Sequence, residues 1–268
     1  MPLLATLVDD FTDGTLDTAS RWSGSYGDLS ETGGRAQIPC GTGYAGLKSA
    51  SAYTLASSAV HLQLFPADPT GAASAAASVL VLSATGGTDA GFIVDPAQNA
   101  VGCYLRSGYA DGGAVFLTYS PVDHRWLRLR EAAGTLYWET SSNGVFWATR
   151  RTAASPAWVS ETGLAFLVEG HRDAGPETPI EVDNVNAPPG QAIQLIAAAV
   201  TEGARPVGLA KVRTLGVAAS IVDVPPIGRR KTRALGVASA TESAQAVGYD
   251  LTVSVGAPWS DWEVGEPW

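Results

Sequence analysis

The composition of this 268-residue chain excludes several classes of protein. Charged residues make up only 16% of it, and the net charge is −9 at pH 7, with the acidic excess lying before residue 188. An acidic domain argues against nucleic-acid binding because contacts to phosphate require Lys and Arg. No apolar stretch is long enough to cross a membrane, so no membrane partner is expected.

The N-terminus is apolar for eight residues and then reaches Asp9 and Asp10. It lacks the basic start of a signal peptide, so we expect a first β-strand over residues 1–8. The two cysteines, Cys40 and Cys103, cannot form a disulfide framework. Separate core residues and a single bridge both stay open.

The region up to residue 187 contains many short runs of β-forming residues, separated by turns rich in Gly, Asn and Asp. The strands predicted in this way are residues 59–65, 78–83, 91–94, 101–106, 114–119, 126–130, 135–140 and 164–168. Residues 136–140 and 145–149 predict a hairpin around the turn at 141–144. No long amphipathic helix is found, and this pattern favours a two-sheet sandwich or jelly roll.

The remainder of the chain has a different organisation. Ala187-Pro-Pro-Gly190 marks the predicted end of a domain that covers residues 1–187. Residues 188–248 then read as three 20-residue repeats, and the last two share Lys211, Arg213 and Leu215 with Lys231, Arg233 and Leu235. Residues 249–268 form a segment rich in Trp, Pro and Gly. Because a 20-residue unit cannot bury a core alone, the repeats predict stacking on neighbours or on another chain.

Several segments of the first domain carry a family resemblance. Residues 9–22 resemble the opening of concanavalin A-like (laminin G-like) jelly rolls, residues 124–131 and 136–147 resemble a tryptophan-containing hairpin of that superfamily, and residues 181–185 resemble its closing strand. The resemblance covers roughly residues 5–187. It implies an all-β fold, a concanavalin A-like jelly-roll sandwich, followed by a C-terminal β-rich repeat extension.

The C-terminal region has a second resemblance. Residues 229–242 and the ending Val255-Gly-Ala-Pro-Trp259 and Val264-Gly-Glu-Pro-Trp268 resemble repeats and endings of minor tail and other virion proteins of phages that infect actinobacteria. It implies a structural virion protein, assembled in the host cytoplasm, whose jelly roll binds host-surface carbohydrate without catalysis. The partners implied are other virion proteins and further copies of this chain, with a trimer favoured. The alternatives are a glycan-degrading enzyme on the same fold and a purely structural decoration protein without a ligand.

The enzyme alternative rests on Glu181 and Asp183, which share one face of a strand because they lie two residues apart. Glycanases resembling the laminarinase family use an E-x-D-x-x-E strand, in which two acids flank the sugar bond. The place of the third acid holds Asn186 here. The catalytic set is therefore incomplete, and we assign no catalytic residue from the sequence.

Acidic residues also suggest a structural Ca²⁺ site, since first and last strands are neighbours in many jelly rolls of this superfamily. The hard oxygen ligands would come from Asp9, Asp10, Asp13 and Asp183. Surface turn residues are the alternative reading. No other cofactor is expected, because the three histidines are widely scattered.

Aromatic side chains offer candidates for carbohydrate stacking, although Trp and Tyr are also ordinary core residues. Tyr109 is the strongest candidate because glycines surround it, and Tyr44, Trp22 and Tyr26 are the others.

The C-terminal region offers candidates for partner docking. Basic side chains there could contact an acidic partner or simply form a solvated face, and terminal tryptophans are typical of interfaces. The docking candidates are Trp259, Trp262, Trp268, Lys211, Arg213, Arg229, Arg230, Lys231 and Arg233.

Overall fold

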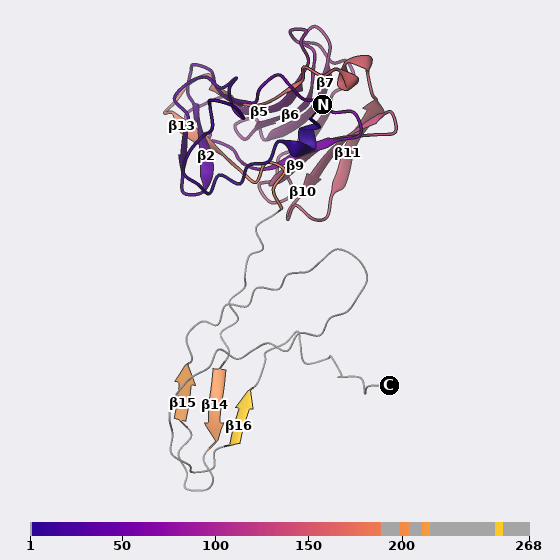
Figure 1. Cartoon of the computed structure of the whole chain (residues 1–268). Coiled ribbons are helices and arrows are strands. Elements are labelled where there is room, and N and C mark those ends of the chain that lie inside the picture. The colour runs from indigo at the N-terminus through magenta and orange to yellow at the C-terminus, as the bar shows by residue number, and fades with distance from the viewer. Residues whose placement is uncertain (1, 189–198, 204–210, 215–249, 254–268) are drawn as a thin grey trace, which may run out of the picture. The chain divides into compact units, whose positions relative to one another are not determined.

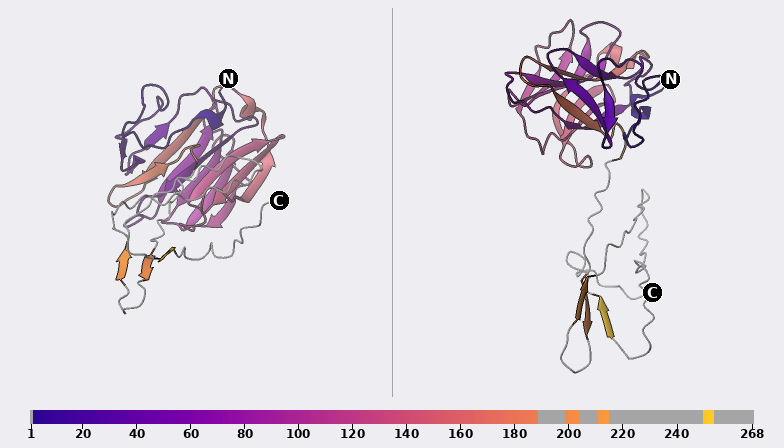
Figure 2. Two further views of the ribbon diagram at one scale, coloured as in Figure 1. Left: turned by 60° about the horizontal axis from the view of Figure 1, so that its bottom comes forward. Right: turned by 90° about the vertical axis from the view of Figure 1, so that its left-hand side faces the viewer.

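The computed structural model describes residues 2–188, 199–203, 211–214 and 250–253 (Figure 1). The chain divides into two compact units, Met1–Gly190 and Gln191–Trp268. In the first unit the described residues form two antiparallel sheets, which are seen from two further sides in Figure 2. This confirms the predicted all-β jelly-roll sandwich of two sheets.

The first sheet has seven strands. Their order across the sheet is β1 (Ser30–Thr32), β2 (Arg35–Cys40), β13 (Thr178–Asp183), β4 (Ala59–Phe65), β9 (Trp126–Ala132), β10 (Thr135–Ser141) and β11 (Ala148–Ala154). The closing strand β13 lies between β2 and β4, so residues from both ends of the jelly roll meet in the middle of this sheet.

The second sheet has six strands. Their order is β3 (Ala45–Lys48), β12 (Ala165–Arg172), β5 (Ala75–Leu82), β6 (Asp89–Asp95), β7 (Ala100–Arg106) and β8 (Val115–Thr118). Short 3-10 helices, η1 (Leu4–Thr6) and η2 (Ala157–Ser160), complete the unit.

Alternation of side chains decides what each strand buries. In β4, for example, Val60, Leu62 and Leu64 point into the core, while His61 and Gln63 are only half-buried and point outward. The inward side chains of both sheets form one apolar cluster, so the sandwich has a single core between its layers. The two outer faces are left for polar and aromatic side chains.

Two local expectations were wrong and one ambiguity is resolved. The N-terminal segment is not a strand, because residues 4–6 form a 3-10 turn whose Leu4 is buried in the core. The hairpin after residue 141 exists, but its second strand starts at Ala148; Val145 and Phe146 donate their backbone N–H groups to the Asn143 side chain instead. Cys40 and Cys103 are both free and buried.

In the second unit the described residues form a three-stranded sheet in the order β15 (Lys211–Thr214), β14 (Ala199–Gly203) and β16 (Asp250–Val253). Most residues of the predicted repeats and of the Trp-rich segment lie outside the described residues. Among the residues that the structure does describe, no helix is long and apolar enough to span a membrane.

Candidate active site

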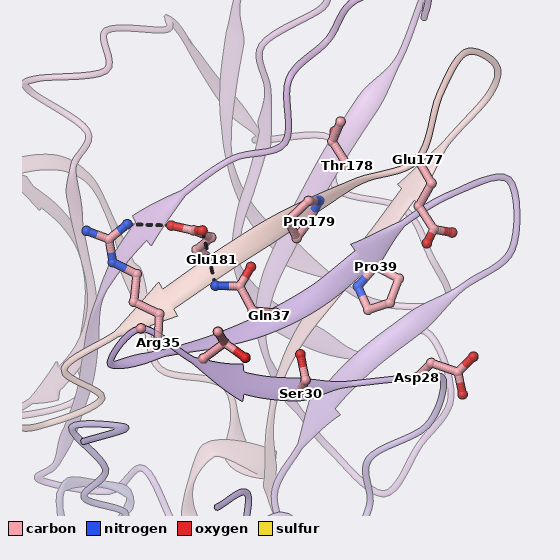
Figure 3. A pocket seen from close by; sticks show the side chains of 11 residues that line it. Asp28, Ser30, Arg35, Gln37, Pro39, Glu177, Thr178, Pro179 and Glu181 are labelled. Carbon is pink, nitrogen blue, oxygen red and sulfur yellow. Dashed lines mark hydrogen bonds and ion pairs between the residues drawn. The ribbon is translucent and has the colours of Figure 1, made fainter. Parts of the chain in front are cut away.

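A polar cavity lies on the outer face of the seven-stranded sheet, over β1, β2 and β13 (Figure 3). Its volume is about 580 Å³. The residues that line it are Asp28, Ser30, Thr32, Gly33, Arg35, Gln37, Pro39, Glu177, Thr178, Pro179 and Glu181. The set arises from strand alternation: β2 buries Ala36, Ile38 and Cys40, so the residues between them face outward.

The strand register places side chains from distant parts of the chain next to one another. Gln37 of β2 lies opposite Glu181 of β13, and Pro39 lies opposite Pro179. On the other side of β2, Gln37 lies opposite Ser30 of the edge strand β1. The cavity therefore combines an apolar pair of prolines with hydroxyl, amide and carboxylate groups.

Glu181 is the best-anchored acid of the cavity. It forms an ion pair with Arg35 and accepts a hydrogen bond from Gln37 Nε2 at 3.1 Å, and both partners point toward its carboxylate in Figure 3. Arg35 is held in turn, because its guanidinium carbon lies 3.7 Å from the centre of the Phe65 ring. Burial alone would raise the pKa of Glu181, but Arg35 and Gln37 outweigh it and lower that pKa below its ordinary value.

Asp183 lies beside the cavity at the end of β13, opposite Gln63 of β4. Strand alternation puts it on the same outer face as Glu181, about 7 Å further along the strand. Burial raises the pKa of Asp183, and the nearby charge of Asp10 adds to this effect; the Asn184 backbone and Arg35 oppose it only in part. The two acids are thus shifted in opposite directions, Glu181 toward the ionised form and Asp183 toward the protonated form.

This pair is suited to acid–base chemistry. One fold can run both halves of a hydrolysis when neighbouring carboxyl groups have their pKa values pushed apart. A separation of about 6.5–9.5 Å between two carboxyl groups is typical of inverting glycosidases, and about 5–5.5 Å of retaining ones. The backbone positions of Glu181 and Asp183 are about 7 Å apart along β13.

Asn186 supplies no third acid and has a structural role. Its side-chain amide donates to the carbonyl oxygens of Leu4 and Leu7, both at 2.8 Å, and its Oδ1 accepts from the backbone N–H of His61 at 2.9 Å. These bonds fasten the segment after β13 to the N-terminal segment and to β4. The E-x-D-x-x-E arrangement of the laminarinase family is therefore not reproduced on β13.

The predicted calcium ligands are engaged elsewhere. Asp9 accepts hydrogen bonds from Arg21 Nη1 and Trp22 Nε1, both at 2.7 Å. Asp10 and Asp13 each accept a hydrogen bond from the backbone N–H of the residue two positions later in the chain. Across residues 2–188 and the described strands beyond, no group of three or more acidic, His or Cys side chains could hold a metal ion. The structure does not gather these aspartates with Asp183 as a Ca²⁺ site.

The predicted stacking residues fall into three places. Trp22 is a correction: it is fully buried and packs against Phe11 in the core, so it cannot bind a sugar. Tyr109 is 75% exposed in the loop between β7 and β8, where its ring lies against Gly87. Tyr26 and Tyr44 lie together at the β3 edge of the six-stranded sheet.

The side chains of the predicted docking residues are not among those that the structure describes. Lys211 and Arg213 lie in β15, whose side chains are not described. The remaining basic residues and the three tryptophans fall outside the described residues.

Sequence reasoning missed Arg35 and Gln37, the partners of Glu181. They belong to β2, which was not predicted as a strand. The available signal was the alternation of apolar and polar residues over 35–40, which a proline at position 39 weakens.

Comparison with known proteins gives similarity at the level of structure only. No protein-family model and no curated protein matches the sequence. The catalytic domain of an endo-1,3-beta-glucanase (laminarinase) from Thermotoga petrophila superposes with a TM-score of 0.50 at 11% identity, covering 66% of this chain and 94% of that one. SCLam, a non-specific endo-beta-1,3(4)-glucanase from family GH16, gives a TM-score of 0.50 at 9% identity, covering 66% and 88%. A mutant of SCLam crystallized with an oligosaccharide gives 0.51 at 10% identity, covering 66% and 91%.

These neighbours correct the expectation drawn from the C-terminal resemblance. We expected a structural phage virion protein without catalysis, and the three structures reported above are instead glucanases. At 9–11% identity the likeness shows the fold alone. What this chain does must therefore be argued from its own side chains.

Proposed function

We propose that the jelly-roll unit is a glycan hydrolase that cleaves by an inverting mechanism, with Asp183 as general acid and Glu181 as general base. The observation that carries the proposal is the pair of same-face carboxyl groups with opposite pKa shifts beside a 580 Å³ cavity. The proteins of similar fold support the class of substrate, because their names specify β-1,3- and β-1,3(4)-glucans.

The proposed reaction uses Asp183 in its protonated form and Glu181 in its ionised form, which are the forms that their pKa shifts favour. Protonated Asp183 donates its proton to the glycosidic oxygen as the bond to the anomeric carbon breaks. Ionised Glu181 accepts a proton from a water molecule, whose oxygen forms the new bond on the opposite face of the sugar. Asp183 ends ionised and Glu181 ends protonated, and solvent exchange restores both.

The surrounding residues bind and orient. Arg35 and Gln37 hold the Glu181 carboxylate in one position, so little reorganisation is needed during the reaction. The paired rings of Pro39 and Pro179 suit the apolar face of a pyranose, and the Ser30 hydroxyl at the cavity wall can bond to sugar hydroxyls.

The test is release of reducing sugar from laminarin and from a mixed-linkage β-glucan. We expect activity in the wild type and none in the double variant Glu181→Gln, Asp183→Asn. Glu161→Gln is the matched control, since Glu161 is exposed on a loop outside the cavity. Equal activity in all three proteins, or none in any across a wider panel of glycans, would refute the assignment.

A further inference from the structure

A second group of side chains suited to sugars lies on the other sheet. The two sheets pack face to face, so their outer faces point in opposite directions. The group lies on the outer face of the six-stranded sheet, at the edge formed by β3 and β12, and consists of Tyr26, Tyr44, Glu169 and His171. We call it the tyrosine patch.

Tyr44 presents a flat exposed ring that is held in place. Its side chain is 62% exposed, yet the ring stacks on the imidazole of His171 with centroids 4.2 Å apart and planes within 17° of parallel. One face of Tyr44 is therefore occupied by the protein. A ring fixed in this way loses little conformational freedom when a ligand stacks on it.

Tyr26 is positioned by the absence of a side chain on Gly46. The two residues exchange backbone hydrogen bonds at 2.9 and 3.0 Å, and a Cβ on Gly46 would lie only 2.6 Å from the Tyr26 ring. The ring thus lies directly over the β3 backbone. Its hydroxyl donates to the Glu169 carboxylate, and the side chain remains 37% exposed.

Register places the polar groups of the patch between small neighbours. Glu169 lies opposite Gly46 on one side and Ser78 on the other, and His171 lies opposite Ala76. None of these strand neighbours has a large side chain, and the rings beside the acid and the imidazole are those of Tyr26 and Tyr44. The patch is therefore open to a flat ligand.

We propose that the tyrosine patch binds a neutral polysaccharide, with a pyranose ring stacked near Tyr44 and sugar hydroxyls bonded to Glu169 and His171. Exposed aromatic rings interspersed with a carboxylate and an imidazole match a sugar ring, which has apolar faces and a rim of hydroxyls. An apolar protein partner would need a contiguous apolar surface, and here the rings alternate with polar groups.

This site is independent of the proposed hydrolysis. It lies on the opposite sheet from Glu181 and Asp183 and shares no residue with the cavity. Its role is to hold polymer on the protein surface, and that role would persist even if the cavity had no catalytic activity.

The experiment is affinity electrophoresis of the full chain in native gels that contain laminarin, mixed-linkage β-glucan, mannan or xylan. We expect at least one of these polysaccharides to retard the wild type. Tyr44→Ala should weaken that binding about tenfold, the size expected for one stacked aromatic ring. Tyr26→Phe, which keeps the ring over Gly46 and removes the bond to Glu169, should weaken it by a smaller factor.

Two controls separate the possible causes. Tyr109→Ala removes a tyrosine of another loop that is even more exposed than Tyr44, 75% against 62%, and should bind like the wild type. Glu181→Gln with Asp183→Asn should also bind like the wild type while losing hydrolysis, so failure of one proposal is distinguishable from failure of the other. The tyrosine patch is overturned if no polysaccharide retards the wild type, or if folded Tyr44→Ala is retarded as strongly as the wild type.

Discussion

The outer faces of the two sheets differ in the kinds of side chain that they carry. On the seven-stranded sheet most charges are paired with one another: Glu181 with Arg35, and Glu139 with both Arg128 and Arg130. Asp183 differs, because burial shifts its pKa upward despite the neighbouring arginine. On the six-stranded sheet, tyrosines and a histidine occupy the β3 edge.

Because of this difference, the two faces can serve separate steps of one task. A face on which one acid has a raised pKa and another a lowered pKa is suited to proton transfer, and the exposed tyrosine ring at the β3 edge of the other face is suited to holding a sugar polymer. Both depend on the same core, since the inward side chains of the two sheets form one cluster. Substitutions on the outer faces should therefore separate the two activities.

The largest expected effect is on hydrolysis by Asp183→Asn. Loss of a positioned general acid should reduce kcat on β-glucan by about 10²–10⁴-fold. The loss should be much smaller on an aryl glycoside with a nitrophenol leaving group, which departs without protonation. Kinetics on both substrates measure this difference, and an equal loss on the two would show that Asp183 is not the acid.

The next effect concerns only the six-stranded face. Gly46→Ala places a methyl group 2.6 Å from the Tyr26 ring and 2.9 Å from Leu167 Cδ1. The ring must shift, so we expect a loss of about 1–3 kcal/mol of stability, as for overpacking elsewhere, together with weaker polysaccharide binding.

Gly43→Ala is the matched control, because a Cβ there would meet nothing within 4 Å. Thermal melts and affinity gels of the two variants measure the contrast. If the two variants behave alike, Tyr26 does not depend on the backbone approach at Gly46.

The pH profile of hydrolysis tests the charge pattern on the other face. Activity requires Glu181 ionised and Asp183 protonated, so it should be highest in the acidic range between the lowered pKa of Glu181 and the raised pKa of Asp183. Arg35→Met removes the main charge that stabilises ionised Glu181. The acid limb of the profile should then move to higher pH, and an unmoved limb would show that Glu181 does not set it.

The smallest effect is on stability at low pH. The pKa of Glu181 is lower in the folded chain than its ordinary value of 4.5, so its ionised form stabilises the fold above that value. This contribution is lost as pH falls through the folded pKa. Glu181→Gln should lower the Tm slightly near neutral pH and flatten this part of the acid dependence. A variant whose Tm falls with pH as steeply as the wild type would count against the Arg35 ion pair.

Strand alternation made much of the fold predictable. Residues 59–65 were predicted as a strand and form β4 with the same bounds, because apolar and polar side chains alternate from Val60 to Leu64. The N-terminal segment misled the prediction, since its apolar residues fill the core from a 3-10 turn. Composition alone cannot distinguish a buried turn from a strand when both are apolar.

The site could be predicted only in part. A two-residue spacing was enough to place Glu181 and Asp183 on one face, but not to identify Arg35, which lies 146 residues before Glu181 in the chain. Tyr44 was among the aromatic candidates, whereas the stacked His171 depends on the pairing of β3 with β12. Trp22 was misassigned because a tryptophan that fills a core and one that binds a sugar look alike in sequence.

The most direct test of the central claim is the stereochemistry of cleavage, followed by ¹H NMR of β-glucan during the first minutes of hydrolysis. An inverting reaction at Glu181 and Asp183 predicts that the α-anomer of the new reducing end appears first and then mutarotates. Initial appearance of the β-anomer, or no new reducing end at all, would contradict the assignment of these two acids.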